Sequence, residues 1–330
     1  MTYVPWEQAW QRALYGDGGF FHRPEGPSGH FRTASTSRVF AAAMHRLAAG
    51  VDRVLGHPGD FTLVDVGAGR GELLSLLAEH VPDRWRLLAV EVAARPAELA
   101  DRIEWSSDLT SPVTGVVLAN ELLDAVPCVI AQCGADGARA VVLVDPATGE
   151  EQLGAPVDDH DADWLARWWP ISEPGQRAEI GRSRDQVWCG LVDSVAAGLL
   201  VAVDYDHGRE HRAALHHGTL AAYRRGHPVP PVPDGTCDLT AHVAFDACAA
   251  GTPEGGWTRL LRQVDTLRSL GVDPTLPGPP LTDHDPMAYA GALATAAESR
   301  VLIDPSGSGA FGWLIHGRGV VESDWEMMRQ

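Results

Sequence analysis

The chain has 330 residues, 45% of them hydrophobic, so it can form a large globular fold with a sizeable core. Its 26 basic and 44 acidic residues give a formal net charge of −18, which argues against binding to nucleic acid or to an anionic membrane. Five cysteines without a C-x-x-C pair, no signal-peptide pattern and no stretch of about 18 apolar residues predict a cytoplasmic protein with free thiols and no membrane span.

The first part of the chain, residues 1–57, is expected to form an N-terminal helical cap. Aromatic and apolar residues four positions apart predict a short helix over 5–15. After a Gly- and Pro-rich loop, an apolar stripe with helical spacing predicts a second helix over 35–55. Ser35 or Thr36 is its expected N-cap.

The remainder, residues 58–330, alternates between strands and helices, which is typical of a mostly parallel α/β sheet. The expected strands are, in chain order, 61–66, 86–91, 103–105, 115–120, 199–204 and 310–316, and the expected helices are 72–80, 97–102, 183–197, 240–250, 257–270 and 285–300. Two insertions are expected, at about 127–182 and 206–256. The first insertion is expected to hold a hairpin, 129–132 and 140–144, followed by an irregular acidic stretch over 146–182.

The central chemical signal is the glycine turn that runs from Asp65 to Gly71 at the end of the first of these strands. Glycines allow a tight turn and the close approach of a ligand to the backbone. A dinucleotide fingerprint would place its third glycine where Glu72 stands. Glu91 ends the next strand, where its carboxylate can accept both ribose hydroxyls. The pattern favours an S-adenosylmethionine site over an NAD site, and over a turn that only packs helix on strand.

A second group of polar residues follows the strand over 115–120. Asn120, Glu121 and Asp124 stand in the segment Asn-Glu-Leu-Leu-Asp-Ala-Val-Pro. Ligands of doubly wound sheets bind beyond the carboxyl ends of the strands. These side chains are therefore expected at the pocket.

This segment resembles the N-E-x-x-D-A-x-P signature of the MidA-like methyltransferases, the family that includes the mitochondrial complex I assembly-factor methyltransferases. Other segments resemble the family in the same order: Gly29 to Thr33 its G-D-F-x-T, Asp204-Tyr205 its D-Y-G, Gly218 to Tyr223 its G-T-L-x-x-Y, and Asp238 to Val243 its D-L-T-A-H-V. The chain departs from the family at His30, where Asp is usual, at Ser35-Thr36, where Pro-Glu is usual, and by Asp206-His207 before Gly208.

The resemblance implies a class I methyltransferase that uses S-adenosyl-L-methionine, with a Rossmann-like, mostly parallel seven-stranded sheet and helices on both faces. It implies cofactor-binding residues at Thr33, Asp65, Gly67, Ala68, Gly69, Gly71, Glu91, Asp108 and Asn120, and catalytic residues at Glu121, Asp124, Asp238 and His242. Because the family is associated with protein arginine methylation, the carboxylates would orient a guanidinium and His242 would take a proton.

Each catalytic candidate has a purely structural alternative. Asp124 fits the N-cap of a helix after the strand at 115–120, and Asp238 fits the N-cap of a helix from Thr240. His242 fits a packing histidine. The histidines near 207–217 lack the clustered Cys or carboxylate partners of a metal site, so no metal is predicted.

The function also has alternatives. The methyl acceptor is expected to be a protein or peptide side chain such as arginine. A small molecule or natural product on the same fold remains open, as does a non-catalytic assembly factor that binds S-adenosylmethionine. The Trp cluster formed by Trp164, Trp168 and Trp169 is expected in a core rather than in a substrate cage.

Overall fold

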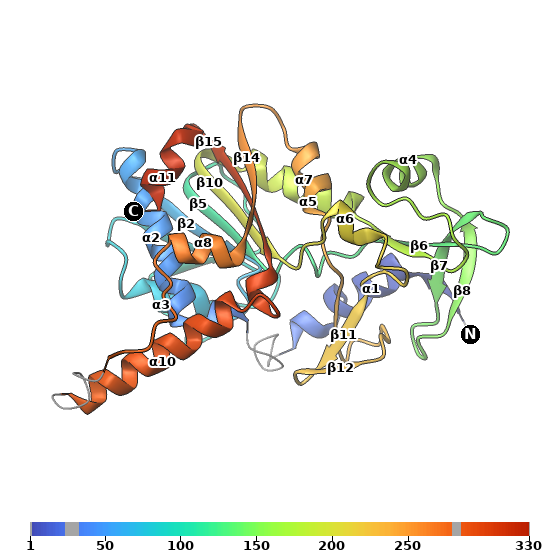
Figure 1. Ribbon diagram of the computed structural model, residues 1–330, viewed down its shortest axis with the longest axis horizontal. Helices are drawn as coiled ribbons and strands as arrows, with labels where there is room; N and C mark the ends of the chain where they lie inside the picture. The colour runs from blue at the N-terminus through green and yellow to red at the C-terminus, as the bar shows by residue number, and fades with distance from the viewer. Residues whose placement is uncertain (1, 24–32, 279–284, 330) are drawn as a thin grey trace.

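A computed structural model describes residues 2–23, 33–278 and 285–329, and its centre is one seven-stranded sheet (Figure 1). The strand order is β14-β15-β10-β5-β2-β3-β4. These strands are β2 (Thr62–Val66), β3 (Arg86–Val90), β4 (Ile103–Ser106), β5 (Val113–Asn120), β10 (Val195–Asp204), β14 (Gly256–Arg262) and β15 (Gly312–Arg318). The five strands from β10 to β4 pair in parallel, and β15 is antiparallel to both of its neighbours. The mostly parallel seven-stranded α/β sheet is thereby confirmed.

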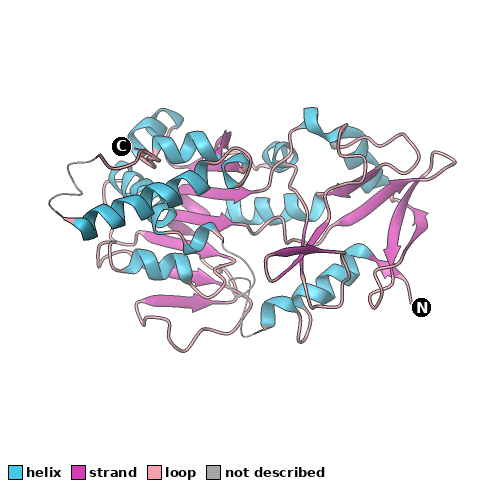
Figure 2. Ribbon diagram, turned by 60° about the horizontal axis from the view of Figure 1, so that its bottom comes forward, coloured by secondary structure: helices cyan, strands magenta, loops and turns pink. Residues whose placement is uncertain are grey.

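Helices cover both faces of this sheet (Figure 2). One face carries α2 (Arg38–Val54), α3 (Glu72–Ala78), α8 (Gln263–Ser269), α10 (Pro286–Ile303) and α11 (Trp325–Met328), and the other carries α5 (Arg182–Asp193) and α7 (Phe245–Gly251). Short 3₁₀ turns are η1 (Phe20–His22), η3 (Ala34–Thr36), η4 (Ser308–Ala310) and η5 (Glu322–Asp324). Among the described helices, none is both long and apolar enough to cross a membrane.

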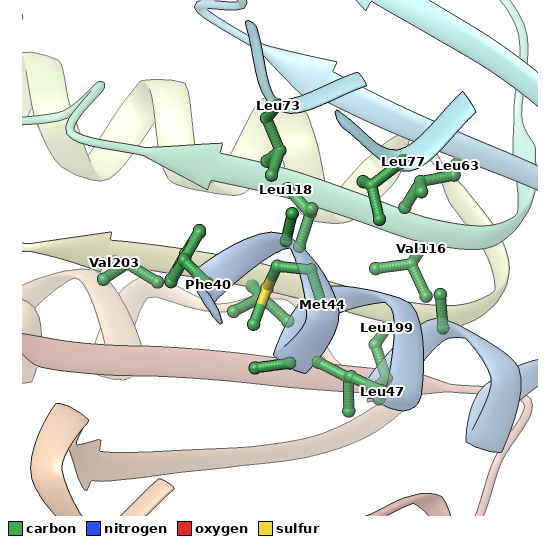
Figure 3. Packing of buried hydrophobic residues seen from close by; sticks show 14 of the residues in the cluster. Phe40, Met44, Leu47, Leu63, Leu73, Leu77, Val116, Leu118, Leu199 and Val203 are labelled. Carbon is green, nitrogen blue, oxygen red and sulfur yellow. The ribbon is translucent and has the colours of Figure 1, made fainter. Parts of the chain in front are cut away.

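The apolar strands divide their side chains between two cores, because neighbouring residues of a strand point to opposite faces. Leu63 and Val116 pack in the cluster of α2, whereas Val64 and Val117 pack in the cluster of α5 and α7. Figure 3 shows the first core, where Phe40, Met44 and Leu47 of α2 project toward strand residues such as Leu118 and Leu199. This double burial explains why these strands are continuously apolar in the sequence.

A second group of strands, most of them shorter, stands beside the main sheet (Figure 1). It contains the antiparallel sheet β1 (Val4–Pro5), β7 (Arg139–Val144), β6 (Val129–Cys133), β9 (Arg177–Ile180) with β8 (Glu151–Pro156) on β7, and the ribbon β12 (His227–Val229), β11 (Ala221–Arg224), β13 (Asp238–Thr240). It also carries α1 (Trp6–Tyr15), α4 (Asp159–Trp168) and α6 (Arg209–Arg212). We call this group the inserted lobe.

The segment 1–57 is divided between the two parts of the molecule. Trp10 and Leu14 of α1 are buried with Ile130 and Leu239 of the inserted lobe, whereas α2 packs on the main sheet. The N-cap of α2 is Ser37, whose hydroxyl accepts the amide N–H of Phe40 (3.0 Å). The expected caps Ser35 and Thr36 instead lie in the 3₁₀ turn before it.

Several expected elements were wrong. Residues 97–102 form turns rather than a helix. The stretch 146–182 is not irregular, since it contains β8, α4 and β9. The segment 257–270 begins with β14, whose pairing with β15 outweighs its helix-like apolar spacing. A helix is present in 240–250 only from Phe245, because Asp238–Thr240 pairs with β11 as a strand.

The buried carboxylate of Asp52 and the exposed Arg84 form an ion pair that joins the end of α2 to the β2–β3 connection. Asp52 is 3% exposed and accepts hydrogen bonds from both terminal nitrogens of Arg84 and from Nδ1 of His57 (2.8 Å). Burial acts to raise the pKa of Asp52, but the hydrogen bonds from Arg84 and His57 outweigh this effect and leave the pKa below its usual value. The carboxylate therefore stabilises the fold only while it is ionised.

Replacing Asp52 by Asn is expected to lower the free energy of unfolding by about 1.5–3 kcal/mol at neutral pH, as for the loss of hydrogen bonds to a charged group. A lowered pKa means that this stabilisation is complete above about pH 4 and is lost as the pH falls further. Chemical denaturation between pH 7 and pH 3 measures the difference. Glu104→Gln, which removes an exposed pair with Arg86, is the control and should cost less than about 1 kcal/mol. A constant difference across this pH range would contradict the assignment.

Candidate active site

The glycine turn leaves β2 at the carboxyl edge of the main sheet. Gly67, Gly69 and Gly71 have positive φ angles of 74°, 59° and 80°, a conformation that residues with a Cβ adopt only under strain. At Gly67 a Cβ would also lie 2.9 Å from Cδ1 of Leu122. Gly71 is the N-cap of α3. The turn therefore exposes backbone without side chains at the carboxyl edge of the sheet, as the sequence pattern predicts.

Glu91, just after β3, is bonded to this turn. Its Oε2 accepts the amide N–H of Gly69 (2.9 Å), and its Oε1 accepts those of Val92 and Ala93 (2.7 and 3.2 Å). Burial raises the pKa of Glu91, and these three amides oppose that effect. The carboxylate is thus fixed across the opening between the ends of β2 and β3.

A cavity of about 190 Å³ lies directly against this carboxylate, and we call it the Glu91 cavity. It is lined by Tyr15, Phe21, Val66, Gly67, Gly69, Val90, Glu91, Val92, Ser107, Glu121, Leu122 and Ala125. The rings of Tyr15 and Phe21 are 5.1 Å apart, and the Tyr15 hydroxyl donates to the Ala125 carbonyl oxygen (3.3 Å). An aromatic wall opposite backbone amides and one carboxylate suits a flat, hydroxylated group such as a nucleoside.

A smaller cavity of about 80 Å³ adjoins it, and we call it the Asp238 cavity. Its lining consists of Phe21, Thr33, Ser35, Gly67, Ala68, Gly69, Glu72, Asn120, Glu121, Asp124, Ala125 and Asp238. The sequence-predicted residues Glu121, Asp124 and Asp238 therefore converge on one space, together with Thr33, Ala68 and Asn120. Residues far apart in the sequence, from Thr33 to Asp238, meet here because β13 of the inserted lobe reaches the edge of the main sheet.

Among the residues that the structure describes, two acceptor oxygens in the Asp238 cavity find no hydrogen-bond donor: Oδ1 of Asn120 and Oδ1 of Asp238. A buried acceptor without a donor carries a free-energy cost. Burial and then the charge of Asp124 raise the pKa of Asp238 well above its usual value. A ligand that brings N–H donors and positive charge would satisfy all of these groups at once.

Glu121 has an unusual backbone. Its φ of 52° places it in the left-handed region, which is uncommon for a residue other than glycine. Its N–H donates to the carbonyl oxygen of Val203 (2.8 Å), and its Oε1 accepts the N–H of Ala34 (3.2 Å) and the Nδ2 of Asn120 (3.1 Å). Burial, with the charge of Asp124, raises the pKa of Glu121 to about 7. The side chain is held where both cavities meet.

Asp124 and Asp238 are not helix caps, because residues 121–127 and 238–243 contain no helix. Asp124 accepts the hydroxyl of Thr240 at Oδ2 (2.6 Å). Burial raises the pKa of Asp124, while the Thr240 hydrogen bond and the charge of Arg184 oppose the rise. The structural alternatives for the two carboxylates therefore fail.

Asp204, at the end of β10, was missed as a site residue. It is completely buried, and Oδ2 accepts the N–H groups of Leu123 (2.9 Å) and Asp124 (3.1 Å) while Oδ1 accepts that of Tyr205 (2.9 Å). Burial, with the charge of Asp124, raises the pKa of Asp204 well above its usual value. The sequence did contain a signal for it: Asp204 is a carboxylate at the end of an apolar strand, as Asn120 and Glu121 are polar residues at the end of the neighbouring strand β5.

Arg184 of α5 binds the same loop from behind. Its guanidinium is 1% exposed and donates to the carbonyl oxygens of Asp124 (3.0 Å), Val126 (3.2 Å) and His242 (2.7 Å). No ion pair within the described ranges involves Arg184. It therefore places one buried positive charge behind the acidic cluster.

His242 lies behind Tyr205 and lines neither of the two cavities. Its imidazole stacks on Tyr205, with centroids 5.5 Å apart and planes at 18°, and its backbone N–H donates to the hydroxyl of Thr219 (3.0 Å). Burial and the charge of Arg184 lower the pKa of His242, so the ring is neutral at pH 7. It lines neither the Glu91 cavity nor the Asp238 cavity.

The remaining cofactor candidates are placed unevenly. Asp65 is the penultimate residue of β2 and is 2% exposed, and burial with the charges of Glu72 and Glu91 raises its pKa to about 8. Asp108 is exposed and lines neither cavity; its Oδ2 accepts the Ser107 hydroxyl (3.1 Å). His30 is one of the positions at which the chain departs from the family pattern, and it lies outside the described residues.

The Trp cluster singled out in the sequence lies away from both cavities. Trp164 and Trp169 are buried in the core under β6 and β9, as predicted. Trp168 is covered by the guanidinium groups of Arg167 and Arg209 (4.7 and 5.3 Å from its centroid). In the described part of the chain, no group of three or more His, Cys, Asp or Glu side chains has the arrangement of a metal site.

The chain is similar in sequence and fold to methyltransferases. A family profile described as "Putative S-adenosyl-L-methionine-dependent methyltransferase" matches residues 47–260. A crystal structure of a Burkholderia thailandensis protein bound to S-adenosyl-homocysteine is 24% identical, with a TM-score of 0.77 and coverage of 96% of this chain and 88% of that one. A native structure from the same organism is 26% identical, with a TM-score of 0.76 and the same coverage. No curated protein matches the sequence.

Replacing Asp204 by Asn is expected to lower the free energy of unfolding by about 1–3 kcal/mol, since the new NH₂ group cannot accept an amide N–H and leaves a buried donor unpaired. Denaturant titration at pH 7 measures the loss. Asp193→Asn, at an exposed carboxylate 3.7 Å from Arg318, should change the free energy by less than about 1 kcal/mol. If the Asp204 variant is as stable as the control, the loop does not depend on this carboxylate.

Proposed function

This chain belongs to the family of S-adenosyl-L-methionine-dependent methyltransferases, and on that premise we propose that it transfers the methyl group to a nitrogen of a cationic acceptor, foremost the guanidinium of an arginine in a protein or peptide. The observation that carries the proposal is the convergence of Glu121, Asp124 and Asp238 on one cavity beside the glycine turn. The family association explains the donor, and the carboxylates favour a positively charged acceptor.

The residues present fit the methyl donor. The Glu91 cavity offers an aromatic wall, bare backbone at Gly67 and Gly69, and a fixed carboxylate, which together suit the adenosine part. The unpaired Oδ1 of Asn120 and the neighbouring carboxylates suit a group with ammonium donors, such as the amino-acid part. When bound, S-adenosylmethionine supplies an electrophilic methyl group on a sulfonium.

The acceptor side is proposed to work through positioning and charge. Glu121 lies where the cavities meet, so its ionised carboxylate can hold an acceptor nitrogen and localise its positive charge away from the reacting atom. Asp124 and Asp238 add negative charge to the same space, and Arg184 keeps their loop in place from behind. Burial raises the pKa values of these carboxylates, and a bound cation lowers them again and so favours the ionised forms.

For His242, which lines neither cavity, we propose that it receives the proton given up by the methylated nitrogen through an intervening water and not by direct contact. Asp65, Gly71 and Thr33 are assigned to shaping and holding the donor site, and Asp108 to its outer edge. For the domains we propose a methyltransferase core from residue 58 with insertions near 127–182 and 206–256, preceded by a segment 1–57 whose α1 packs in the inserted lobe and whose α2 packs on the core. The five free cysteines favour a reducing cytoplasm.

Replacing Glu91 by Ala is expected to weaken the binding of S-adenosylhomocysteine by about 1.5–3 kcal/mol, the scale of hydrogen bonds to a charged group. The variant also frees three amides, so Glu91→Gln is measured beside it and should lose less. Isothermal titration calorimetry gives both affinities. Glu98→Ala, at an exposed carboxylate paired with Arg70, is the control and should bind as the wild type does. Equal affinity for all variants, or tighter binding of NAD, would refute the donor site.

Replacing Glu121 by Gln is expected to preserve S-adenosylhomocysteine binding and to lower methyl transfer at least about tenfold, or roughly 1.4 kcal/mol in the transition state. Because the pKa of Glu121 is raised to about 7, wild-type kcat/KM should rise as the pH increases through 7, and the variant should lose this rise. Labelled-methyl transfer to extract proteins and to small guanidines measures both. An unchanged rate and pH profile in the variant would exclude Glu121 from the reaction.

A further inference from the structure

A third cavity, of about 820 Å³, also reaches Glu121, and we call it the outer cavity. It is lined by polar and apolar side chains of η3, of the start of α2 and of α10, together with Tyr205 and Phe311. Glu121 lines the outer cavity as well as the Glu91 and Asp238 cavities, whereas Tyr205 lines the outer cavity only. Tyr205 therefore stands beside the proposed reaction site without being part of the donor site.

Tyr205 directly follows β10, and the fold holds both its backbone and its ring. Its N–H donates to Oδ1 of Asp204 (2.9 Å), and its carbonyl oxygen accepts the N–H of Val243 (2.7 Å). The ring stacks on His242, with centroids 5.5 Å apart and planes at 18°, and it packs against Phe311 with centroids 4.1 Å apart. The position of the phenol is thus set before any ligand arrives.

The hydroxyl group of this fixed ring is left over by the fold. Tyr205 is 39% exposed, and among the described residues no hydrogen bond engages its hydroxyl; its bonds are those of its backbone. The hydroxyl of Tyr15, in contrast, donates to a backbone carbonyl oxygen. Burial and then the charge of Glu121 raise the pKa of Tyr205. The phenol therefore keeps its proton and lies within the electrostatic reach of the Glu121 carboxylate.

Glu121 has one oxygen left for a ligand as well. Its Oε1 accepts the N–H of Ala34 and the Nδ2 of Asn120, whereas Oε2 takes part in no hydrogen bond within the part of the chain that the structure describes. Arg38 also lines the outer cavity, but no ion pair in that part of the chain involves Glu121. A ligand in the outer cavity therefore meets one charged and one neutral side chain with a free acceptor oxygen.

From this arrangement we propose that Tyr205 is a binding residue for the methyl acceptor: its hydroxyl oxygen accepts one N–H of an arginine guanidinium while the carboxylate of Glu121 accepts another. A guanidinium has five N–H donors, no acceptor and a permanent positive charge, so it fits such a pair of oxygens. Because the guanidinium comes from the proposed function, the role of Tyr205 rests on that function. It adds a contact from β10 and the outer cavity, outside the donor site.

Replacing Tyr205 by Phe removes the hydroxyl and keeps the ring. The kcat/KM for labelled-methyl transfer to acetyl-Gly-Arg-Gly-amide is expected to fall at least about tenfold, as for the loss of one hydrogen bond to a charged group. Since the fold loses no hydrogen bond, denaturant titration should give the wild-type stability. Calorimetry should give the wild-type affinity for S-adenosylhomocysteine, because Tyr205 does not line the Glu91 cavity. Tyr289→Phe, on α10 and outside the lining of the outer cavity, is the control and should change none of these quantities.

A spectroscopic measurement tests the contact without turnover. The protein is labelled with ¹³C at Cζ of its five tyrosines, and the Tyr205→Phe and Tyr289→Phe variants identify the two signals. Titration of the S-adenosylhomocysteine-loaded protein with acetyl-Gly-Arg-Gly-amide should shift the Tyr205 signal progressively and leave the Tyr289 signal in place. The same peptide with citrulline in place of arginine has a similar shape but no charge to pair with Glu121. At the same concentrations it should leave the Tyr205 signal unmoved.

The outcomes separate the role of Tyr205 from the proposed function. If the arginine peptide is methylated while the Tyr205 signal stays in place, or if Tyr205→Phe is as active as the wild type, the role of Tyr205 is refuted and the proposed function stands. If the peptide shifts the Tyr205 signal but receives no methyl group, the contact is supported and transfer to arginine fails. If the peptide neither shifts the signal nor is methylated, both are refuted.

Discussion

The carboxylate of Asp204 is the constraint on which the geometry of the site depends. At the carboxyl edge of a parallel sheet the chain leaves each strand, and the backbone N–H groups just beyond the strand have no partner in the sheet. When they are buried, they need another hydrogen-bond acceptor. Asp204 takes the amides of Leu123 and Asp124 on the β5 side and of Tyr205 on its own side. It thereby fixes the exits of two adjacent strands with one buried group. The left-handed turn at Glu121 lies immediately before these amides, so its strained backbone is held by bonds that follow it.

This arrangement gathers negative charge in a place where charge is costly. Burial raises the pKa values of Asp204, Asp124, Asp238 and Glu121, and the charge of Asp124 adds to the rise at the other three. Arg184 lies behind them but spends its donors on carbonyl oxygens rather than on carboxylates. The negative charge of the four carboxylates is therefore not balanced by a direct ion pair with Arg184. A free protein in this state favours any ligand that brings positive charge and N–H donors, and the functional proposal follows from this imbalance.

The parts of the site that could be predicted from the sequence are those set by one strand and its exit. A buried strand reveals itself by a continuous apolar run, and the polar residue that ends it, such as Glu91 or Glu121, lies at the carboxyl edge by geometry alone. Tyr15 and Phe21 were not predicted, because they reach the Glu91 cavity through the packing of α1 on the inserted lobe. β14 was mistaken for a helix since its identity as a strand comes from pairing with β15, which no local pattern records.

The inserted lobe contributes side chains to both cavities. The main sheet by itself supplies the glycine turn, Glu91 and Glu121, which is one wall of a site open to water. Asp238 arrives on β13, Tyr15 on α1 and Thr240 beside Asp124, all from the other side of the opening. Charges enclosed between two such walls interact more strongly than on a free sheet edge, because less water screens them. Both cavities therefore depend on the two parts of the chain together: the sheet edge supplies the glycine turn and Glu91, and the lobe adds Tyr15 to one cavity and Asp238 to the other.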